Sequence, residues 1–468
     1  MKTIKYYSKL ILIYFSLIAP ISFAGCEDEV IEDASTDGTE IEGEDENEST
    51  YEPVPFSLGE YNPTSGGKET ELHLYGTGFG KDINNVTVTV NSTEAEVTEV
   101  DGYYIKAKVA AKSGTGAVKV RIGEEELTYD TPFTYNYGTT VSTWFGKKIE
   151  DQNEKKYGTL EEARLWKPMS IAFDNKGTLY IVQDKDNYDI AMVKDGKVSQ
   201  FLNGLEYAKT CKYMFNIAFS KDYDYMYISN NYANEASDGS NIVSIPWDNN
   251  GSKYDVSKLS VFWDRTDITK DVRCVTVHPI TGEIFAVHGG EESKIYRFDK
   301  TQNKMVDTGT ILPNKDGDAV RYLNSRCILF SKDGNTVYIS GYNCGVIYKG
   351  DYNQTTGEFS NLNIWVGKYN EAGWQEGKGT EAKLNQPFQM DIDDEGNLYV
   401  AVQKAHRIAK ITPDGVVTNY AGTGTSGTSD GTPEEAQFNH PSGLQFGPDG
   451  VLYVSDYWNH MIRKIETE

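Results

Sequence analysis

The sequence contains little positive charge for its length. Its 468 residues include 45 lysines and arginines against 70 aspartates and glutamates, which gives a formal net charge of −25 at pH 7. Binding to DNA or RNA requires a basic surface that neutralises phosphates, so no nucleic-acid partner is expected. Residues 27–47 contain neither lysine nor arginine. Such an acidic segment buries too little apolar surface to fold, and we expect residues 26–53 to form a solvated tether.

Long apolar runs are also scarce, and only the N-terminal segment contains one. Lysines precede the apolar residues 10–24, which are too few for a comfortable membrane span but suit a secretory signal peptide over residues 1–25. Ala24 and Gly25 before Cys26 resemble a bacterial lipobox, although Phe23 stands where leucine is usual. The resemblance implies a lipid on Cys26 that anchors the protein to a membrane, the alternative being ordinary cleavage with a free Cys26. The acidic residues that follow resemble signals that send lipoproteins to the outer face of the outer membrane.

Metal-binding and redox motifs are missing. The other four cysteines match no zinc or redox spacing, so they are expected either as buried free thiols or as one structural disulfide. The six histidines form no HxH or HExxH motif, and no acidic triplet falls on one face. No catalytic residue, metal site or cofactor is therefore predicted. An enzymatic role remains an alternative, because the paired carboxylates of glycoside cleavage can come from distant segments.

Residues 54–137 contain short β-type runs with turn residues between them. The runs cover residues 71–76, 85–90, 95–100, 103–110 and 117–123 and show no helical period. This pattern predicts an antiparallel sandwich. The stretch NPTSGGKETELHLYGTGF at 62–79, with PFTYNYG at 132–138, resembles the IPT/TIG family of immunoglobulin-like domains. The resemblance implies a spacer rather than a binding site.

Residues 138–468 repeat one unit six times. Each unit has an apolar run, a turn and a second run with one aromatic residue, and these residues recur every 47 to 61 positions as Tyr180, Tyr227, Phe285, Tyr338, Tyr399 and Tyr453. Six units, each long enough for four strands, predict an all-β domain with the architecture of a six-bladed β-propeller. The lead-in GTPEEAQFNHPSGLQF at 431–446, its counterparts in the first and fifth units, and the tripeptide NHM at 459–461 resemble the NHL-repeat family.

The last unit lacks one strand. The run VVTNYAG at 416–422 completes the preceding unit, and its match, VSTWFG at 141–146, stands ahead of the first unit. We predict that this N-terminal strand pairs with the final blade. The pairing would close the ring and remove an unpaired strand edge.

One end of the predicted channel is rich in aromatic side chains. In a propeller, the loops leading into the innermost strands and the loops joining the second and third strands share one end of the channel. Flat rings, carboxamides and arginines in these loops suit the C–H faces and hydroxyls of sugars, although the aromatic residues could instead pack between blades. The predicted ligand-binding residues are Trp166, Tyr188, Tyr232, Arg273, Arg326, Tyr342, Asn343, Tyr457 and Trp458.

Two of these residues form a pair. Arg273 and Arg326 each precede a cysteine at equivalent positions of adjacent units. Paired guanidinium groups could clamp a carboxylate or a sulfate. They could equally form ion pairs with channel carboxylates such as Asp184 or Asp391.

The complete arrangement resembles accessory surface lipoproteins that capture glycans for outer-membrane polysaccharide uptake systems. The resemblance implies a lipid-anchored outer-membrane protein that faces the cell exterior and binds a poly- or oligosaccharide without catalysis. It also implies an outer-membrane transporter complex as a possible partner in polysaccharide utilisation. The alternatives are a lyase or hydrolase acting in the propeller channel and a protein-interaction module of a surface complex.

Overall fold

The structure, a computed structural model, describes residues 54–184, 189–207, 210–211, 213–230, 240–264, 272–288, 293–319 and 323–468. These residues form β-strands and short 3-10 helices, which confirms the predicted all-β class. The 3-10 helices are η1 (Ile83–Asn85), η2 (Gln152–Glu154), η3 (Val256–Lys258), η4 (Gly379–Glu381), η5 (Gln403–Ala405) and η6 (Tyr457–Asn459). None of the described helices is long and apolar enough to cross a membrane. The predicted signal peptide, Cys26 and the acidic tether lie outside the described residues.

The N-terminal described module is an immunoglobulin-like β-structure. Its strands are β1 (Ser57–Asn62), β2 (Ser65–Gly66), β3 (Glu71–Thr77), β4 (Val86–Val90), β5 (Thr93–Asp101), β6 (Tyr104–Lys108), β7 (Val118–Ile122), β8 (Glu125–Thr128) and β9 (Thr134–Tyr135). The long β5 pairs first with β4 and then with β6, so it joins two halves of a seven-stranded sheet of order β1-β3-β6-β5-β4-β7-β8. In β4, Val86, Val88 and Val90 are buried because alternate side chains of a strand face the same side. Both halves contribute to one core.

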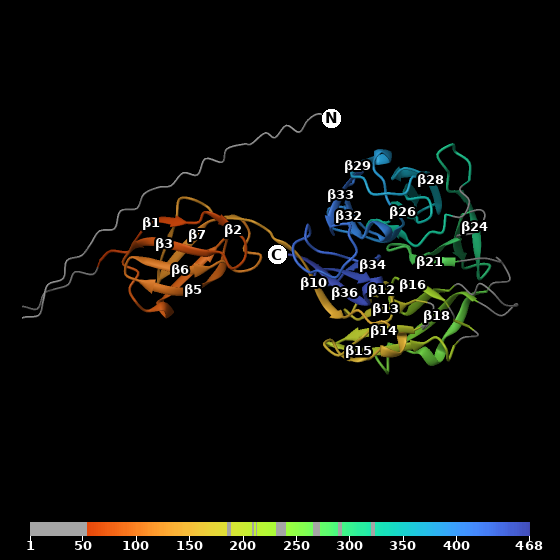
Figure 1. The fold of residues 1–468 in the computed structure, drawn as a ribbon, viewed down its shortest axis with the longest axis horizontal. Helices are drawn as coiled ribbons and strands as arrows, with labels where there is room; N and C mark the ends of the chain where they lie inside the picture. The colour runs from red at the N-terminus through yellow and green to blue at the C-terminus, as the bar shows by residue number, and fades with distance from the viewer. Residues whose placement is uncertain are drawn as a thin grey trace, which may run out of the picture. The chain divides into compact units, whose positions relative to one another are not determined.

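The C-terminal module is a propeller of six β-sheets, one for each repeat (Figure 1). Blade 1 contains β12 (Pro168–Phe173), β13 (Leu179–Gln183), β14 (Asp189–Lys194) and β15 (Lys197–Asn203), with β11 (Gly158–Thr159) at its edge. Blade 2 contains β16 (Met214–Phe219), β17 (Tyr225–Asn230), β18 (Ser240–Asp248) and β20 (Ser260–Asp264), with β19 (Lys253–Tyr254) paired to β18. Blade 3 contains β21 (Val272–Val277), β22 (Ile284–His288), β23 (Lys294–Asp299) and β24 (Lys304–Ile311).

The other three blades repeat this order from the channel outward. Blade 4 contains β25 (Ile328–Phe330), β26 (Thr336–Gly341), β27 (Val346–Asn353) and β28 (Glu358–Val366). Blade 5 contains β30 (Pro387–Ile392), β31 (Leu398–Val402), β32 (Arg407–Ile411) and β33 (Val416–Ala421), with β29 (Gly377–Lys378) at its edge. Blade 6 contains β34 (Pro441–Phe446), β35 (Leu452–Asp456), β36 (Met461–Thr467) and β10 (Thr139–Gly146).

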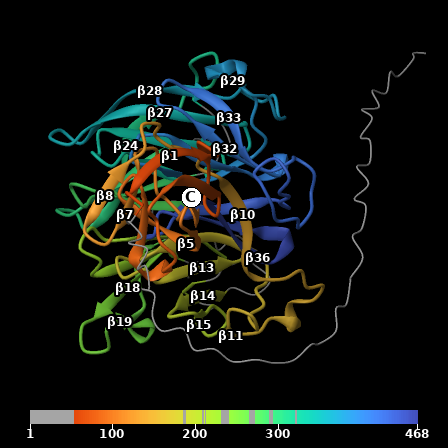
Figure 2. The ribbon, with the colours of Figure 1, turned by 90° about the vertical axis from the view of Figure 1, so that its left-hand side faces the viewer.

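The ring is closed by its two ends. Strand β10 pairs antiparallel with β36, with Val141 opposite Ile465, and the two strands lie side by side in Figures 1 and 2. The Trp144 ring also packs edge-on against Tyr453, with 4.8 Å between ring centroids. The predicted closure by the N-terminal strand is therefore confirmed.

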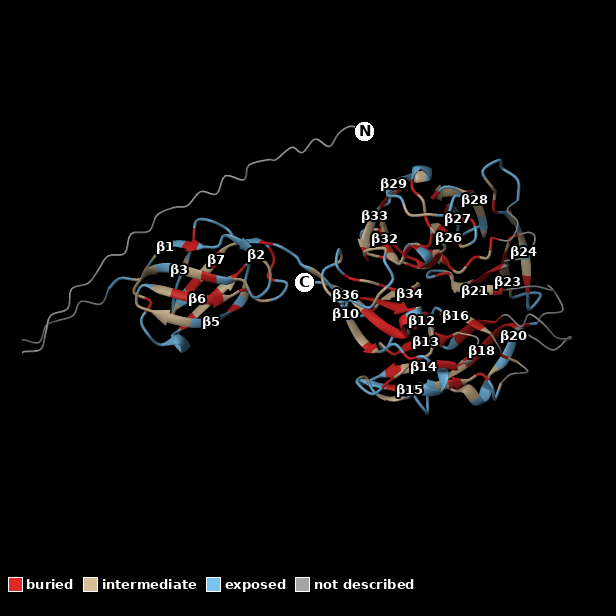
Figure 3. Ribbon diagram, viewed as in Figure 1, coloured by how far each residue is buried: buried red, intermediate tan, exposed pale blue. Residues whose placement is uncertain are grey.

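The second strand of a blade lies between the first and third strands and is covered on both faces. All five residues of β13, β31 and β35 are buried, and Figure 3 shows buried residues concentrated inside the propeller. The turns before them use short polar side chains. Asp174 Oδ1 accepts hydrogen bonds from the backbone N–H groups of Lys176 (2.9 Å) and Thr178 (2.8 Å). Gly177 in the same turn has φ +77°, a conformation that glycine adopts without strain.

Candidate functional site

Each blade places one residue at the same position around the channel mouth, within or just before its innermost strand. We call these residues the mouth ring, and they are Met169, Phe215, Arg273, Arg326, Phe388 and Ser442. In five blades, the pairing of the first two strands shifts register at this position. A β-bulge of this kind leaves a residue out of the ladder and redirects its side chain.

The mouth ring forms the floor of one cavity. The cavity has a volume of about 710 Å³ and is lined by every member of the mouth ring except Ser442. Its walls come from loops of several blades, namely from Asp184, Tyr213, Tyr342, Gln386, Gln403, Lys404, His440, Tyr457 and Trp458. This volume lies in the range typical of small-molecule sites.

Arg326 lies at the bottom of the cavity among aromatic rings. Its guanidinium carbon is 4.8 Å from the Tyr342 ring centroid, 5.0 Å from that of Phe215 and 5.3 Å from that of Phe388. The guanidinium carbon of Arg273 is 5.2 Å from the same Phe215 ring. Both arginines therefore share an aromatic base, which provides cation–π stabilisation.

The sequence left open whether Arg326 pairs with a channel carboxylate, and it does not pair with one within the described residues. The Asp391 carboxylate accepts hydrogen bonds from the backbone N–H groups of Ile392 and Phe446 instead. The Asp184 carboxylate accepts a hydrogen bond from the Tyr457 hydroxyl. Burial, together with the charge of Arg273, lowers the pKa of Arg326 to about 10, so it remains a cation at pH 7.

The cavity carries a positive balance of charge. Arg273, Arg326 and Lys404 line it, whereas Asp184 is the one carboxylate among the lining residues. His440 adds no charge at pH 7, because burial lowers its pKa to about 4. This local balance is opposite in sign to the net charge of −25 on the whole chain.

One wall of the cavity is held by side-chain amides. The Tyr342 hydroxyl lies 2.9 Å from Oε1 of Gln386 and 2.7 Å from Oε1 of Gln403. Gln403 is oriented in turn by its Nε2 group, which donates to Ser442 Oγ at 2.8 Å. The Tyr342 ring is therefore fixed before any ligand arrives.

Tyr457 and Trp458, from blade 6, form another and more open part of the cavity wall. Their rings meet edge-on with 5.3 Å between centroids, and Trp458 is 41% exposed. An exposed tryptophan beside a cavity is an apolar platform that water contacts at a free-energy cost.

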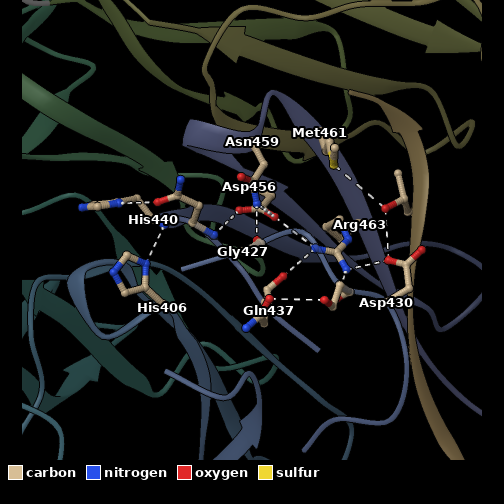
Figure 4. A network of polar contacts seen from close by, with 12 residues as sticks. His406, Gly427, Asp430, Gln437, His440, Asp456, Asn459, Met461 and Arg463 are labelled. Atoms are coloured by element: carbon tan, nitrogen blue, oxygen red, sulfur yellow. Dashed lines mark hydrogen bonds and ion pairs between the residues drawn. The ribbon is translucent and has the colours of Figure 1, made fainter. Parts of the chain in front are cut away.

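A buried polar network holds the loop that carries these two rings (Figure 4). The Asn459 Nδ2 group donates to the Gly427 carbonyl (2.6 Å) and to Asp456 Oδ2 (2.7 Å). Asp456 also accepts a hydrogen bond from Arg463 Nη1 at 3.1 Å, and neither of these two residues is exposed. The Asn of the NHM tripeptide thus fixes the turn of η6, which places Tyr457 and Trp458 at the cavity.

The histidine of the same tripeptide joins neighbouring blades. His460 Nδ1 accepts a hydrogen bond from the backbone N–H of Lys167 at 3.0 Å, which links blade 6 to blade 1. His406 Nδ1 accepts one from the backbone N–H of His440 at 3.2 Å, which links blade 5 to blade 6. Burial lowers the pKa of both imidazoles, that of His460 to about 4, so Nδ1 is free to accept.

The structure places the predicted ligand-binding residues in three groups. Arg273, Arg326, Tyr342, Tyr457 and Trp458 line the cavity. Trp166 and Asn343 do not line it, whereas Tyr188 and Tyr232 lie outside the described residues.

Trp166 and Asn343 have other contacts. The Trp166 ring stacks on His460 at 4.8 Å, and Lys167 Nζ lies 4.8 Å from the Trp166 centroid and 4.6 Å from that of Trp458. Asn343 Oδ1 accepts a hydrogen bond from Asn324 Nδ2 at 3.3 Å.

The sequence interpretation missed several lining residues, above all Phe215 and Gln386. Phe215 occupies the same repeat position as Arg273 and Arg326. Aligning the units on that position, instead of on the preceding loops, would have found it. Gln386 gave no local signal, because its role depends on the Tyr342 hydroxyl of the neighbouring blade.

The described cysteines form no disulfide, and the described side chains form no metal-binding cluster. The four cysteines after the tether are buried free thiols, which was one of the two expectations. No group of three or more His, Cys, Asp or Glu side chains that could hold a metal ion occurs within the described part of the chain.

Three parts of the chain match family models. Residues 57–135 match the IPT/TIG domain, residues 438–465 match the NHL repeat, and residues 281–430 match the SMP-30/gluconolactonase/LRE-like region. The chain therefore combines an IPT/TIG domain with a six-bladed propeller that contains NHL and SMP-30-like sequence. Among curated proteins, NHL repeat-containing protein 2 from Homo sapiens is 38% identical over 97 residues, which is 20% of this chain and 13% of that protein. The chain thus spans only a small part of that relative's length.

Solved structures from Bacteroides share the fold over most of this chain. An auxiliary nutrient binding protein from Bacteroides ovatus aligns with a TM-score of 0.70 and 24% identity, covering 88% of this chain and 98% of that one. An auxiliary nutrient binding protein from Bacteroides thetaiotaomicron aligns with a TM-score of 0.62 and 25% identity, with the same coverage of 88% and 98%. A protein described as a putative phosphatase from Bacteroides thetaiotaomicron aligns with a TM-score of 0.65 and 24% identity, covering 88% and 97%.

Proposed function

We propose that this protein binds a glycan in the cavity of its propeller and does not transform it. The observation that carries the proposal is the make-up of the cavity, which combines aromatic rings, carboxamides and arginines in about 710 Å³. Sugars present apolar C–H faces that stack on such rings, and their hydroxyls need partners that both donate and accept. The Bacteroides thetaiotaomicron auxiliary nutrient binding protein, at 25% identity, supports a binding role.

The two parts of the cavity wall would contact a sugar in different ways. Trp458 and Tyr457 offer a platform on which a sugar ring replaces water. The part of the wall formed by Tyr342, Gln386 and Gln403 is already ordered by its own hydrogen bonds. A preordered wall loses little side-chain entropy on binding, which favours affinity.

The proposal includes a place in the cell. Lipidation at Cys26 and the acidic residues after it would anchor the protein to the outer membrane, facing the exterior, where it would pass glycans to a transporter complex. Labelling of cells with an alkyne-tagged fatty acid, followed by protease treatment of intact cells, tests this directly. Wild-type protein should be labelled and digested, and Cys26→Ala should lose the label. Labelled protein that resists protease until cells are lysed would contradict an exterior location.

Calorimetric titration with a panel of neutral and acidic oligosaccharides tests binding. Trp458→Ala should weaken binding about tenfold, because it removes the platform without touching the core. Tyr225→Ala is the matched control, since Tyr225 is 45% exposed but starts β17 at the opposite end of blade 2. Equal affinity of wild-type and Trp458→Ala protein, or no binding across the panel, would contradict the proposed site.

The match to the SMP-30/gluconolactonase region favours one other candidate, a hydrolase that acts in the same cavity. Asp184 is the lining carboxylate that would have to serve as its acid or base. Mass spectrometry of bound oligosaccharides separates the two functions. Smaller products that disappear with Asp184→Asn would favour the hydrolase, and recovery of intact ligand would favour capture.

A further inference from the structure

Arg326 occupies the constriction of the propeller channel. The cavity at the mouth has a counterpart of about 220 Å³ inside the channel, lined by residues of all six innermost strands or the loops leading into them. Of the described residues, Arg326 alone lines both cavities. A group that descends to the bottom of the mouth cavity therefore meets this side chain.

The channel below Arg326 is crossed by a side chain. Gln389 reaches from β30 to β12, where its Nε2 group donates to the Ile171 carbonyl at 2.8 Å and its Oε1 atom accepts from Ser170 Oγ at 3.1 Å. Its Oε1 atom also accepts a hydrogen bond from the backbone N–H of Ile171 at 3.2 Å, so both ends of the amide are held by blade 1. Because Gln389 narrows the channel and the cavity there is only about 220 Å³, we infer that a glycan approaches Arg326 with one end.

Arg326 has donors that nothing in the described protein satisfies. Its Nε and Nη1 atoms are shielded from solvent and have no hydrogen-bond partner among the described residues. The residue as a whole is only half-buried, because it opens on the cavity. A shielded cation without a counter-charge is unfavourable, and proteins pair such groups or use them to bind an anion.

The surroundings favour an anion over a water molecule or a neutral hydroxyl. Arg273 and Lys404 add positive charge to the same cavity, and Asp184 is engaged by the Tyr457 hydroxyl. The Phe215 and Phe388 rings beneath Arg326 keep water away from the guanidinium, which strengthens its attraction for a negative charge.

We propose that the ligand is an acidic glycan that enters end first and places an oxyanion of its terminal sugar, a carboxylate or a sulfate ester, on Arg326. This inference rests on the proposed glycan-binding function and specifies its substrate class. The remaining sugars extend past Tyr457 and Trp458 toward the exterior. Arg326 is the anion ligand, and Arg273 supports it by raising the local potential.

Matched oligosaccharides test the charge requirement. One set ends in glucuronate or galacturonate, the second ends in the corresponding glucose or galactose, and the third ends in a 6-sulfated sugar. Calorimetry with the full chain should give at least about tenfold tighter binding for the acidic ends than for the neutral ends. The ratio of the first and third sets decides between carboxylate and sulfate. Equal binding of acidic and neutral ends would overturn the proposal while leaving glycan binding intact.

The variant Arg326→Met tests whether Arg326 causes the preference for acidic ends. It keeps an apolar stem over the aromatic base and removes an unpaired charge, so thermal unfolding should show no loss of stability. Affinity for acidic ends should fall by about tenfold more than affinity for neutral ends, so that the preference for acidic ends is lost. Lys349→Met is the matched control, because Lys349 Nζ lies over the Trp365 ring at 4.7 Å outside the cavity. Unchanged preference for acidic ends in Arg326→Met would overturn the role of Arg326.

The end-first geometry has its own test. An oligosaccharide with a uronic acid only in its interior, flanked by neutral sugars on both sides, should bind no better than a neutral one. Equal affinity for interior and terminal acids would refute entry by one end. If wild-type protein binds none of these oligosaccharides, the proposed function itself fails.

Discussion

Replacing Arg463 by methionine should destabilise the propeller far more than a surface substitution does. Its guanidinium makes four contacts, to Asp456 (3.1 Å), Asp430 (2.6 Å), the Gln437 carbonyl (2.8 Å) and the Ser429 carbonyl (2.9 Å). Arg463 and Asp456 are both fully buried. Removing one partner of a buried ion pair leaves the other charge uncompensated, which typically costs about 3–5 kcal/mol. We expect Arg463→Met to lower the free energy of unfolding by about this amount, a large part of the total for an ordinary domain.

The pH dependence of this loss identifies its cause. Burial raises the pKa of Asp456 to about 6, and Arg463 is the main group that opposes the rise. Without Arg463 the pKa must rise further, so the folded variant binds a proton that the unfolded chain has lost. A raised pKa gives stability at low pH that is lost as pH increases. The deficit of Arg463→Met should therefore shrink as the pH is lowered from 8 to 5.

Urea unfolding followed by tryptophan fluorescence measures the deficit. Asp456→Asn combined with Arg463→Met should recover part of the lost stability, because the stranded charge is gone. Arg297→Met is the control, since Arg297 is 30% exposed on its side chain and donates to the Gly357 carbonyl at 2.9 Å. We expect the control to cost about 1 kcal/mol or less. The reasoning is refuted if Arg463→Met costs no more than the control, or if the double variant is no more stable than the single one.

Three other predictions concern closure, acid sensitivity and thiols. Val141→Asp places a charge at a buried position of the closing strand and should lower the free energy of unfolding by urea by about 3 kcal/mol. Thr140→Asp, on the exposed side of the same strand, should lower it by about 0.5 kcal/mol or less, and similar values for the two variants would contradict closure by β10. Burial lowers the pKa of His460 from 6.5 to about 4, so the folded state excludes a proton that the unfolded chain accepts. The free energy of unfolding should therefore fall by about 1–2 kcal/mol as the pH decreases from 6.5 to 4, and His460→Asn should make it less dependent on pH. Burial raises the pKa of Cys211 to about 12, so mass spectrometry should find the four described cysteines alkylated by iodoacetamide only after unfolding; rapid labelling of the folded protein would contradict their burial.

The fold could be predicted because its signals are local and repeated. The aromatic residue of each second strand, from Tyr180 to Tyr453, recurs in the sequence and packs between strands in the structure. The closing strand was predictable for a related reason, since an incomplete last unit and an orphan run at 141–146 fit each other.

The site could be predicted only in part, because side-chain direction at the channel mouth is set by β-bulges. Arg273 and Arg326 were found from their shared position, but Phe215 at that position was passed over. Trp166 was expected in the cavity because of its loop, yet its ring turns onto His460, a contact between the first and last blades. Such a contact depends on ring closure and leaves no trace in the nearby sequence.

The bulged residues of the mouth ring give this scaffold a simple route to new specificity. A bulged residue takes no part in the ladder of its own blade, so exchanging its side chain breaks no backbone hydrogen bond. Phe215 could thus be replaced to alter the shape or charge that a ligand meets, whereas an exchange at Met169 or Phe388 must also fill the core that these side chains occupy. The five bulged positions, one in each of five blades, would let engineers change which ligand is captured without redesigning the whole propeller.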